Sequence, residues 1–389
     1  MSWLTALLLG PCIGPACNFD TLSPWATYLA TARDAPADTP PIHILQIGDS
    51  HTAGDALTGG LRALLQAEWG SGGRGVLPPG RPYAGYRTRG VTVSMSPGWR
   101  IGASFGPGST APRPPLGLSG FTLSSTTPEA RMGLVAEPDM AFDRFVLCAM
   151  AGMVTRSMKV RIGETVQAID LDSDIVEPRC TTLRFETPQT AIELIPDSGP
   201  VTITSWATFR DKGGIALSNL GIVGSQLQHF ARTDDDVVAA ELRAYAPDLI
   251  ILAFGTNEGF GPRIDAQGYE AMLRAQIARL RALAPETPLL MLGPPDALSR
   301  NPALRGAGAI DCGDGLFAPA GLGQVRAVQR SVAGNLGIAW WDWQARMGGA
   351  CSARRWVASG GMRGDFVHFT TPGGAEIAQL LRHDLAHRD

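Results

Sequence analysis

The spacing of apolar and polar residues divides the chain into three regions, and the first is residues 41–98. Here an unbroken apolar run, IHILQIG (42–48), is followed by a helical pattern, ALTGGLRALLQAEWG (56–70), that stops at a glycine. A continuous apolar run of this length is typical of a strand that is buried on both faces of a parallel sheet. The run and the helical pattern therefore predict half of a βα unit.

The same alternation returns in residues 216–389. The predicted strands are 248–255, 287–295 and 337–343, and the predicted helices are 269–285, 322–336 and a last helix from about 373. In the helix 269–285, apolar residues share one face at helical spacing, namely Leu273, Ile277, Leu280 and Ala284. Strands that alternate with helices predict a right-handed, mostly parallel α/β sheet.

Residues 99–215 have a different pattern, with many Gly, Pro, Ser and Thr residues and short β-like runs bounded by turn residues. The runs are 142–150, 157–163, 165–171, 181–187, 190–196 and 201–209. This pattern predicts an inserted β-rich, sandwich-like module between two segments of one α/β domain. The alternative is a set of long, partly ordered loops, which are uncommon inside a compact fold.

Composition agrees with a globular protein, since 44% of the 389 residues are hydrophobic and 18% are charged. The net charge is -3, and the sequence has no block of like charges that would suggest a nucleic-acid surface. The densest acidic run, TDDDV (233–237), is interpreted as a solvated helix start, because no His or Cys stands nearby to complete a metal site.

The N-terminal residues 1–18 have an apolar stretch followed by small residues, which is typical of a secretory leader. The usual basic start is missing, so an apolar N-terminal arm is the alternative. We expect an exported, periplasmic or otherwise secreted protein. The chain contains no run of 18 apolar residues, so no membrane span is expected.

The cysteines are six, an even number, and none forms a CxxC pair or a zinc-like cluster. If the chain is exported, disulfides are expected, whereas six buried thiols are the alternative. Order along the chain favours three pairs: Cys12 with Cys17, Cys148 with Cys180, and Cys312 with Cys351.

Four polar signals stand where ligands bind in a parallel α/β sheet, beyond the carboxyl ends of strands. They are Ser50, the glycine-rich stretch 218–226, Asn257, and the pair Asp365 and His368. Each has a simpler explanation, since a serine often caps a helix and glycine or asparagine often makes a turn. No simpler explanation covers all four in this order on one alternating pattern.

These motifs resemble the four blocks of the SGNH (GDSL-type) hydrolases. GDSH (48–51) matches the Ser block, GIVG (221–224) the Gly block, GTNE (255–258) the Asn block and DFVH (365–368) the Asp-x-x-His block. His51 stands where many members have Leu. The resemblance implies the three-layer α/β fold of that superfamily, interrupted here by the β-rich module.

A closer resemblance is to bacterial peptidoglycan O-acetylesterases, carried by AWWDWQARMGGACSARRW and the following GDFVHFTTPGGAEIA. In that group a β-rich module that resembles a carbohydrate-binding domain lies between the Ser and Gly blocks. The implied partner is O-acetylated peptidoglycan or another acetylated glycan, with no nucleic acid.

The resemblance implies acyl transfer through a covalent intermediate. Ser50 would be the nucleophile, His368 the base and Asp365 the group that orients the base. The backbone N–H groups of Ser50 and Gly224 and the side-chain amide of Asn257 would hold the oxyanion. No metal or cofactor is needed.

Neighbouring residues are expected to be structural. Asp49 is predicted to brace the turn before Ser50, and Asp342 is not the orienting acid. The tryptophans 340, 341 and 343 are interpreted as core and rim. Hydrolysis or acyl transfer on another polysaccharide, a lipid esterase and a non-catalytic glycan-binding scaffold remain alternatives.

Overall fold

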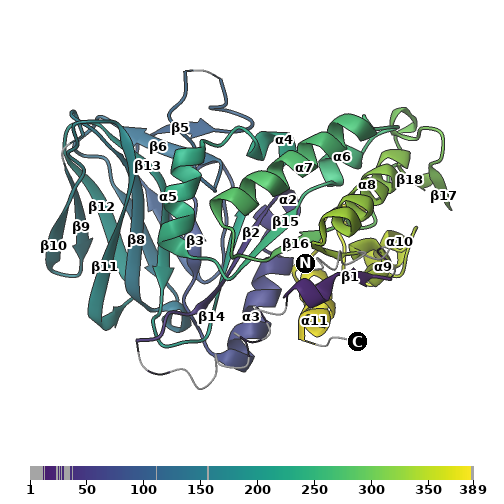
Figure 1. Cartoon of the computed structure of the whole chain (residues 1–389), viewed down its shortest axis with the longest axis horizontal. Helices are drawn as coiled ribbons and strands as arrows, with labels where there is room; N and C mark the ends of the chain where they lie inside the picture. The colour runs from purple at the N-terminus through teal and green to yellow at the C-terminus, as the bar shows by residue number, and fades with distance from the viewer. Residues whose placement is uncertain are drawn as a thin grey trace, which may run out of the picture.

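The mixed α/β class is confirmed by a computed structural model, which describes residues 12, 14–22, 25, 27, 29, 36 and 38–386, without 111 and 156. The central sheet has six strands (Figure 1). Their order is β1 (Ala16–Cys17), β19 (Ala339–Trp341), β16 (Leu289–Leu292), β15 (Leu249–Ala253), β2 (Ile42–Gly48) and β14 (Ile215–Gly221). Neighbours pair in parallel except β1, which lies antiparallel to β19 at one edge.

Helices cover both faces of the central sheet. Successive side chains of each buried strand point to opposite faces, so each strand contacts helices on both sides. Ile44 of β2 packs on one side with α3 (Leu57–Trp69) and α11 (Thr371–Ala386). Leu45 packs on the other side, with a set of three helices (Figure 1). The set is α5 (Asp235–Tyr245), α7 (Ala266–Leu283) and α8 (Ala320–Leu336). The continuous apolar run of β2 therefore reflects burial on both faces.

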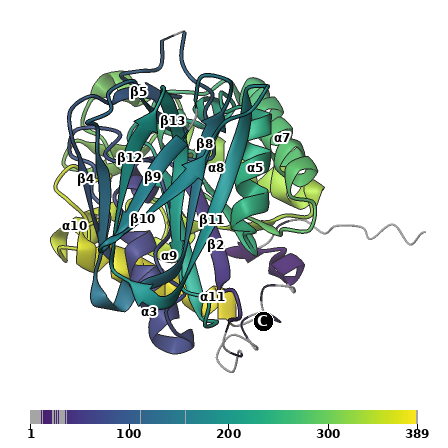
Figure 2. The same ribbon diagram turned by 90° about the vertical axis from the view of Figure 1, so that its left-hand side faces the viewer.

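Two antiparallel sheets enclose a core of their own (Figure 2). One has the order β10 (Thr165–Asp170), β9 (Ser157–Ile162), β12 (Ala191–Ser198), β7 (Met132–Ala136) and β4 (Val91–Met95). The other has β11 (Glu177–Gln189), β8 (Phe142–Ala151), β13 (Val201–Phe209), β6 (Phe121–Ser125) and β5 (Arg100–Ala103), with β3 (Gly75–Leu77) on β13. Strands β3 and β4 lie before residue 99, so these sheets draw on more of the chain than 99–215.

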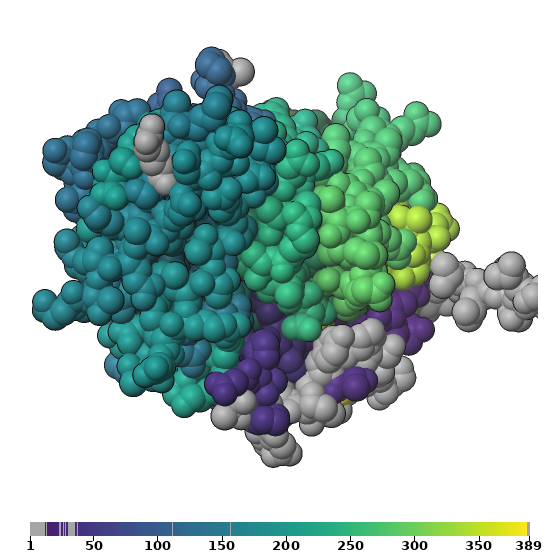
Figure 3. All heavy atoms as spheres, turned by 60° about the vertical axis from the view of Figure 1, so that its left-hand side comes forward, coloured from purple at the N-terminus to yellow at the C-terminus, as the bar shows by residue number. Residues whose placement is uncertain are grey.

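The antiparallel sheets also share a core with the central sheet. Val146 of β8 and Phe209 of β13 belong to the apolar cluster that contains α5, α7 and α8. Glu241 of α5 is fully buried at this junction, where it accepts hydrogen bonds from the Leu118 backbone N–H at 2.6 Å and the Thr204 hydroxyl at 2.7 Å. Figure 3 shows the β-rich part (teal) directly against the helices (green) on this face.

The sequence patterns of the helices agree with their packing. Leu273, Ile277 and Leu280 are buried on α7, whereas Ala284 follows the last helical residue. The acidic run at 233–237 begins α5, as predicted, with Asp235 and Asp236 in its first turn. The three tryptophans of AWWDW are all buried, at most 2% exposed, which confirms them as core rather than a sugar-stacking surface.

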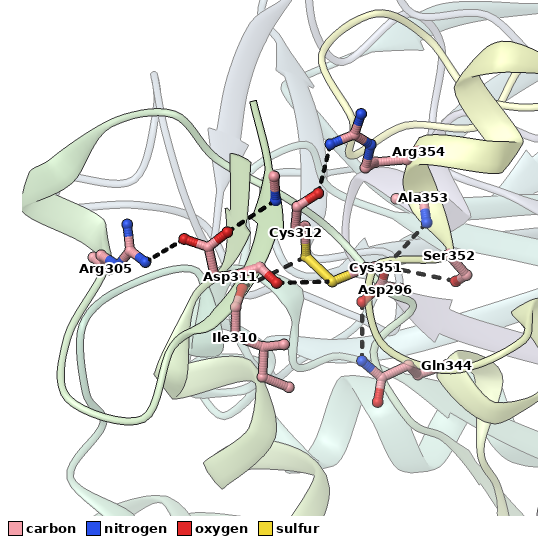
Figure 4. Close-up of a disulfide and its surroundings, with 11 residues drawn as sticks. Asp296, Arg305, Ile310, Asp311, Cys312, Gln344, Cys351, Ser352, Ala353 and Arg354 are labelled. Atoms are coloured by element: carbon pink, nitrogen blue, oxygen red, sulfur yellow. Dashed lines mark hydrogen bonds and ion pairs between the residues drawn. A yellow bond between two sulfur atoms is a disulfide. The ribbon is translucent and has the colours of Figure 1, made fainter. Parts of the chain in front are cut away.

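All three predicted disulfides are present. Cys148 and Cys180 lie opposite each other on β8 and β11. Figure 4 shows the third, in which Cys312 of the hairpin β17–β18 joins Cys351 in the loop before α10. The two strands of the hairpin and the helices on either side of this loop are β17 (Ile310–Gly313), β18 (Leu316–Ala318), α9 (Trp343–Met347) and α10 (Ala353–Ala358). The link restrains the chain just before the Asp365 and His368 block.

Most of the expected leader, residues 1–11 and 13, lies outside the described residues. Its described part belongs to the fold, because Ala16 and Cys17 pair with β19. Among the helices that the structure describes, none has the length and apolarity needed to cross a membrane.

Candidate active site

The ends of three neighbouring strands bring the Ser, Gly and Asn blocks together. Gly48, the last residue of β2, lies opposite Gly221 of β14 on one side and Ala253 of β15 on the other. Because these strands are parallel, their carboxyl ends meet at one edge of the sheet. Ser50 and Asn257 follow their strands within a few residues and so reach the same edge.

Ser50 is the first residue of a short helix, α2 (Ser50–Ala53). The cap of this helix is Asp49, whose carboxylate accepts a hydrogen bond from the His51 backbone N–H at 2.9 Å. The expected bracing role of Asp49 is therefore confirmed, and the Ser50 hydroxyl is not used for capping. Gly221 lets α2 approach this closely, since a Cβ there would collide with the backbone nitrogen of Ala53.

Ser50, His368 and Asp365 form a continuous chain of hydrogen bonds. The Oγ atom of Ser50 lies 3.0 Å from Nε2 of His368, and Nδ1 of His368 lies 2.9 Å from Oδ2 of Asp365. Partial burial opposes ionisation of Asp365, but hydrogen bonds from the His368 backbone and ring and from the Val367 backbone lower its pKa. The carboxylate is thus held ionised beside the imidazole, with one ring nitrogen left to face the serine.

The Gly and Asn blocks are tied to each other next to Ser50. The Asn257 side-chain amide donates to the Ser225 carbonyl at 2.8 Å, and the Gln226 side chain donates to the Asn257 carbonyl at 2.9 Å. The Ile222 backbone N–H donates to the Gly48 carbonyl at 3.1 Å, which fixes this loop beside the strand end that precedes Ser50. Gly224 has a φ of 79°, a conformation that favours glycine. The short helices of the two blocks are α4 (Leu227–Phe230) and α6 (Thr256–Gly259).

Three neighbours of this site were not predicted from the sequence. The Phe105 ring lies against Gly224 and stacks on His229 with 4.2 Å between ring centroids. Burial raises the pKa of Glu258, the residue after Asn257, to about 7. His51 was noted only as a departure from the family pattern, but it contacts the segment that carries His368. Local sequence spacing carries no signal for contacts between residues so far apart.

A buried ion pair lies next to the turn that carries Ser50 and is connected to it by hydrogen bonds. Asp55 and Arg62 lie 3.0 Å apart with side chains 2% exposed, and Arg74 approaches the same carboxylate at 3.8 Å. Asn219 connects this pair to α2, because it accepts from Arg62 at 3.3 Å and donates to the Thr52 carbonyl at 3.0 Å. Burial opposes the charge on Asp55, but Arg62 and Arg74 outweigh it and lower the pKa of the carboxyl group.

We expect Arg62→Gln to reduce the free energy of unfolding by about 3 kcal/mol, because it leaves the buried carboxylate with a single, more distant cation, Arg74, beside its hydrogen bonds from Thr58 and Arg89. Since the pKa of Asp55 is lowered in the folded state, its contribution is present above the ordinary Asp pKa and is lost as the pH falls below it. Urea unfolding at several pH values measures this, and the difference from wild type should narrow below about pH 4.

The matched control for Arg62→Gln is Arg161→Gln. Arg161 pairs with Glu193 at 2.7 Å, but its side chain is 50% exposed. Exposed ion pairs contribute at most about 1 kcal/mol. Equal losses of stability in the two variants would contradict the structural role of the Asp55 and Arg62 pair.

Comparison with known proteins agrees with this geometry. The GDSL-like Lipase/Acylhydrolase family model matches residues 197–375. The chain is similar to a solved structure of a peptidoglycan O-acetylesterase, with 27% identity and a TM-score of 0.78 over 96% of this chain and 98% of that one. No curated protein matches the chain.

Family two carbohydrate esterases are more distant. The one from Cellvibrio japonicus has 14% identity and a TM-score of 0.25, over 76% of this chain and 98% of that one. The one from Clostridium thermocellum, in complex with cellohexaose, has 10% identity and a TM-score of 0.32, over 80% and 98%. Both likenesses are too weak to support an inference.

Proposed function

Because the chain is an SGNH (GDSL-type) hydrolase, and thus a carboxylic ester hydrolase, we propose that it removes O-acetyl groups from the glycan chains of peptidoglycan. Family membership gives the class of enzyme, and the substrate and the Ser-His-Asp mechanism are what we propose for this chain. The observation that carries it is the hydrogen-bonded chain of Ser50, His368 and Asp365, in a fold similar over 96% of its length to a peptidoglycan O-acetylesterase.

In the proposed mechanism His368 removes the proton from Ser50 as the hydroxyl oxygen attacks the acetyl carbonyl. Nε2 is within hydrogen-bond distance of Oγ, and Asp365 on the other ring nitrogen stabilises the imidazolium that forms. The protonated His368 then gives its proton to the departing sugar hydroxyl. Water, activated by the same histidine, releases acetate from Ser50.

The negative charge on the carbonyl oxygen would be stabilised by three donors. They are the backbone N–H groups of Ser50 and Gly224 and the side-chain amide of Asn257. The hydrogen bond from Asn257 to the Ser225 carbonyl uses one of its two amide hydrogens, so the other is available. The start of α2 at Ser50 also orients a backbone N–H toward the same edge.

We expect Asn257→Ala to lower kcat by roughly 10²- to 10³-fold, because one oxyanion donor contributes about 3 kcal/mol in the transition state. The KM of nitrophenyl acetate should change much less, since the charge exists only in the transition state. Gln228→Ala is the control, because Gln228 is exposed on the neighbouring α4. If steady-state kinetics of Asn257→Ala show a larger change in KM than in kcat, Asn257 is not a donor to the oxyanion.

The openness of the site favours a polymeric substrate. The side chains of His368 and Asp365 are 35% and 45% exposed, so they lie near the surface rather than in a deep tunnel. An ester carried on a glycan chain can therefore reach these side chains without entering an enclosed cavity. We propose that the β-rich part, with Phe105 beside Gly224, provides the surface that orients this chain.

The disulfides support an exported protein. All six cysteines are paired, and structural disulfides persist mainly in oxidising compartments. We propose the periplasm or the cell exterior as the working location, which is also where peptidoglycan is accessible.

Acetate release from O-acetylated cell walls, compared with walls that were first de-O-acetylated, tests the proposed substrate. We expect release only from the former, and none with Ser50→Ala. Transfer of acetyl groups to a sugar hydroxyl without release of acetate would favour an O-acyltransferase. Preference for long-chain nitrophenyl esters would favour a lipid esterase, and binding of walls without turnover of any ester would favour a scaffold.

A further inference from the structure

Both ring nitrogens of His51 face hydrogen-bond acceptors. Nε2 lies 3.0 Å from the Val367 carbonyl oxygen, and Nδ1 lies 3.2 Å from Oδ1 of Asp49. A carbonyl oxygen and an ionised carboxylate can only accept, so each of these contacts requires a proton on the histidine. The ring is 7% exposed, which leaves little room for water to supply another partner. A doubly protonated, positively charged ring satisfies both contacts.

The His51 ring also stacks on the ring of His368. Their centroids are 5.5 Å apart and their planes are inclined by 28°. The other sides of His51 meet Trp343 and Phe369, edge to face. A positive charge at this distance opposes a second positive charge on His368.

In the part of the chain that the structure describes, three titratable groups face His51. Asp49 lies on its own segment, and Asp365 and His368 lie on the segment packed against it. Asp49 partly offsets the charge of His51, so its effect on His368 is reduced but keeps its sign.

The segment that carries Asp365 and His368, here called the Asp-His loop (residues 363–369), depends on outside contacts. Phe366 has a φ of 60°, a left-handed conformation that is strained for a bulky residue. Its carbonyl accepts from the Leu298 backbone N–H at 3.1 Å, and the next carbonyl, of Val367, is the one that faces His51. Two successive carbonyls thus anchor the loop to two different parts of the fold.

We propose that His51 is a positively charged positioning residue, which holds the Asp-His loop through the Val367 carbonyl and disfavours protonation of His368. The inference rests on the proposed role of His368 as base. Burial opposes a charge on His51, but the hydrogen bond and charge of Asp49, the Val367 carbonyl and the charge of Asp365 together raise its pKa. A leucine at this position could supply neither the charge nor the hydrogen bonds.

The first test is the pH dependence of kcat/KM for nitrophenyl acetate in His51→Gln. Glutamine can still donate to the Val367 carbonyl but carries no charge. We expect the midpoint of the acid limb to move up by at most about half a pH unit, which is the interaction of two charges 5.5 Å apart in a water-like dielectric before the partial offset by Asp49. The loss of activity should therefore be larger at pH 6 than at pH 8.

A merely structural role would lower the rate by the same factor at every pH. His383→Gln on α11 is the control, because the side chain of His383 is 63% exposed. An unmoved acid limb in a folded His51→Gln protein would overturn the charge effect. If the Ser50→Ala protein kept its activity, the proposed triad would fail instead, so the two failures are distinguishable.

The second test observes the protonation of His51 directly in the wild-type protein and does not depend on enzyme turnover. Nitrogen-15 NMR of the six histidines reports protonation of each ring nitrogen, and His51 is assigned by the signals lost in His51→Gln. We expect both nitrogens of His51 to be protonated at pH 7, in wild type and in Ser50→Ala alike. A neutral His51 ring at that pH, with one bare nitrogen, would overturn the proposal.

Discussion

Ser50→Ala is expected to lower the turnover of an acetyl ester by roughly 10⁴-fold or more, because it removes the proposed nucleophile of the acyl-enzyme step. The variant should fold normally, since the cap of α2 is supplied by Asp49 and, among the described residues, the Ser50 side chain hydrogen-bonds only to His368. Stopped assays with nitrophenyl acetate measure the rate. Labelling by a fluorophosphonate should disappear in parallel.

Ser331→Ala on α8 is the control for this substitution, because Ser331 is exposed on a helix that is far from Ser50 along the chain. Its turnover and its labelling should match the wild type. Near wild-type turnover in a correctly folded Ser50→Ala protein would remove the proposed triad.

Asp365→Asn should lower kcat by roughly 10²- to 10⁴-fold with a smaller effect on KM. One oxygen of Asp365 accepts from the Val367 and His368 backbone N–H groups at 2.9 Å, and an asparagine oxygen can replace it. The other oxygen faces Nδ1 of His368, where an asparagine NH₂ would favour the wrong tautomer of the ring. The loop is thus retained while the base is disabled.

Asp342→Asn is the matched control. Asp342 also follows a strand end, but it caps α9 and pairs with Arg330 at 2.7 Å. We expect this variant to lose thermal stability and keep its turnover. The opposite result, an active Asp365→Asn and an inactive Asp342→Asn, would transfer the orienting role to Asp342.

The parts of the site that could be predicted were those with a local signature. Ser50 and Asn257 each follow a buried apolar run, and the end of such a strand lies at a known edge of the sheet. Asp365 and His368 are three residues apart, so their contact is a property of one turn. The tryptophans of AWWDW were assigned to the core from their place in a strand, and they are buried there.

The parts that could not be predicted depend on contacts between distant segments. His51 and the Val367 carbonyl are 316 residues apart along the chain, and no periodicity records that they meet. Strands β3, β4 and β5 are only 3 to 5 residues long and lie among glycines and prolines. The alternation of apolar and polar residues in such short strands is too brief to be recognised in the sequence. The position of Phe105 against Gly224 could not be predicted either, because it depends on how two distant loops fold together.

The core shared by the β-rich part and the central sheet limits how the protein can move. A hinge that opened between them would expose Val146 and Phe209 and would leave the buried Glu241 carboxylate without Leu118 and Thr204. Both changes are unfavourable, because apolar surface would meet water and the Glu241 carboxyl group would lose its hydrogen bonds from Leu118 and Thr204. The shared core therefore favours a fixed arrangement of the β-rich part and the central sheet, so the glycan surface that we propose there would be preformed.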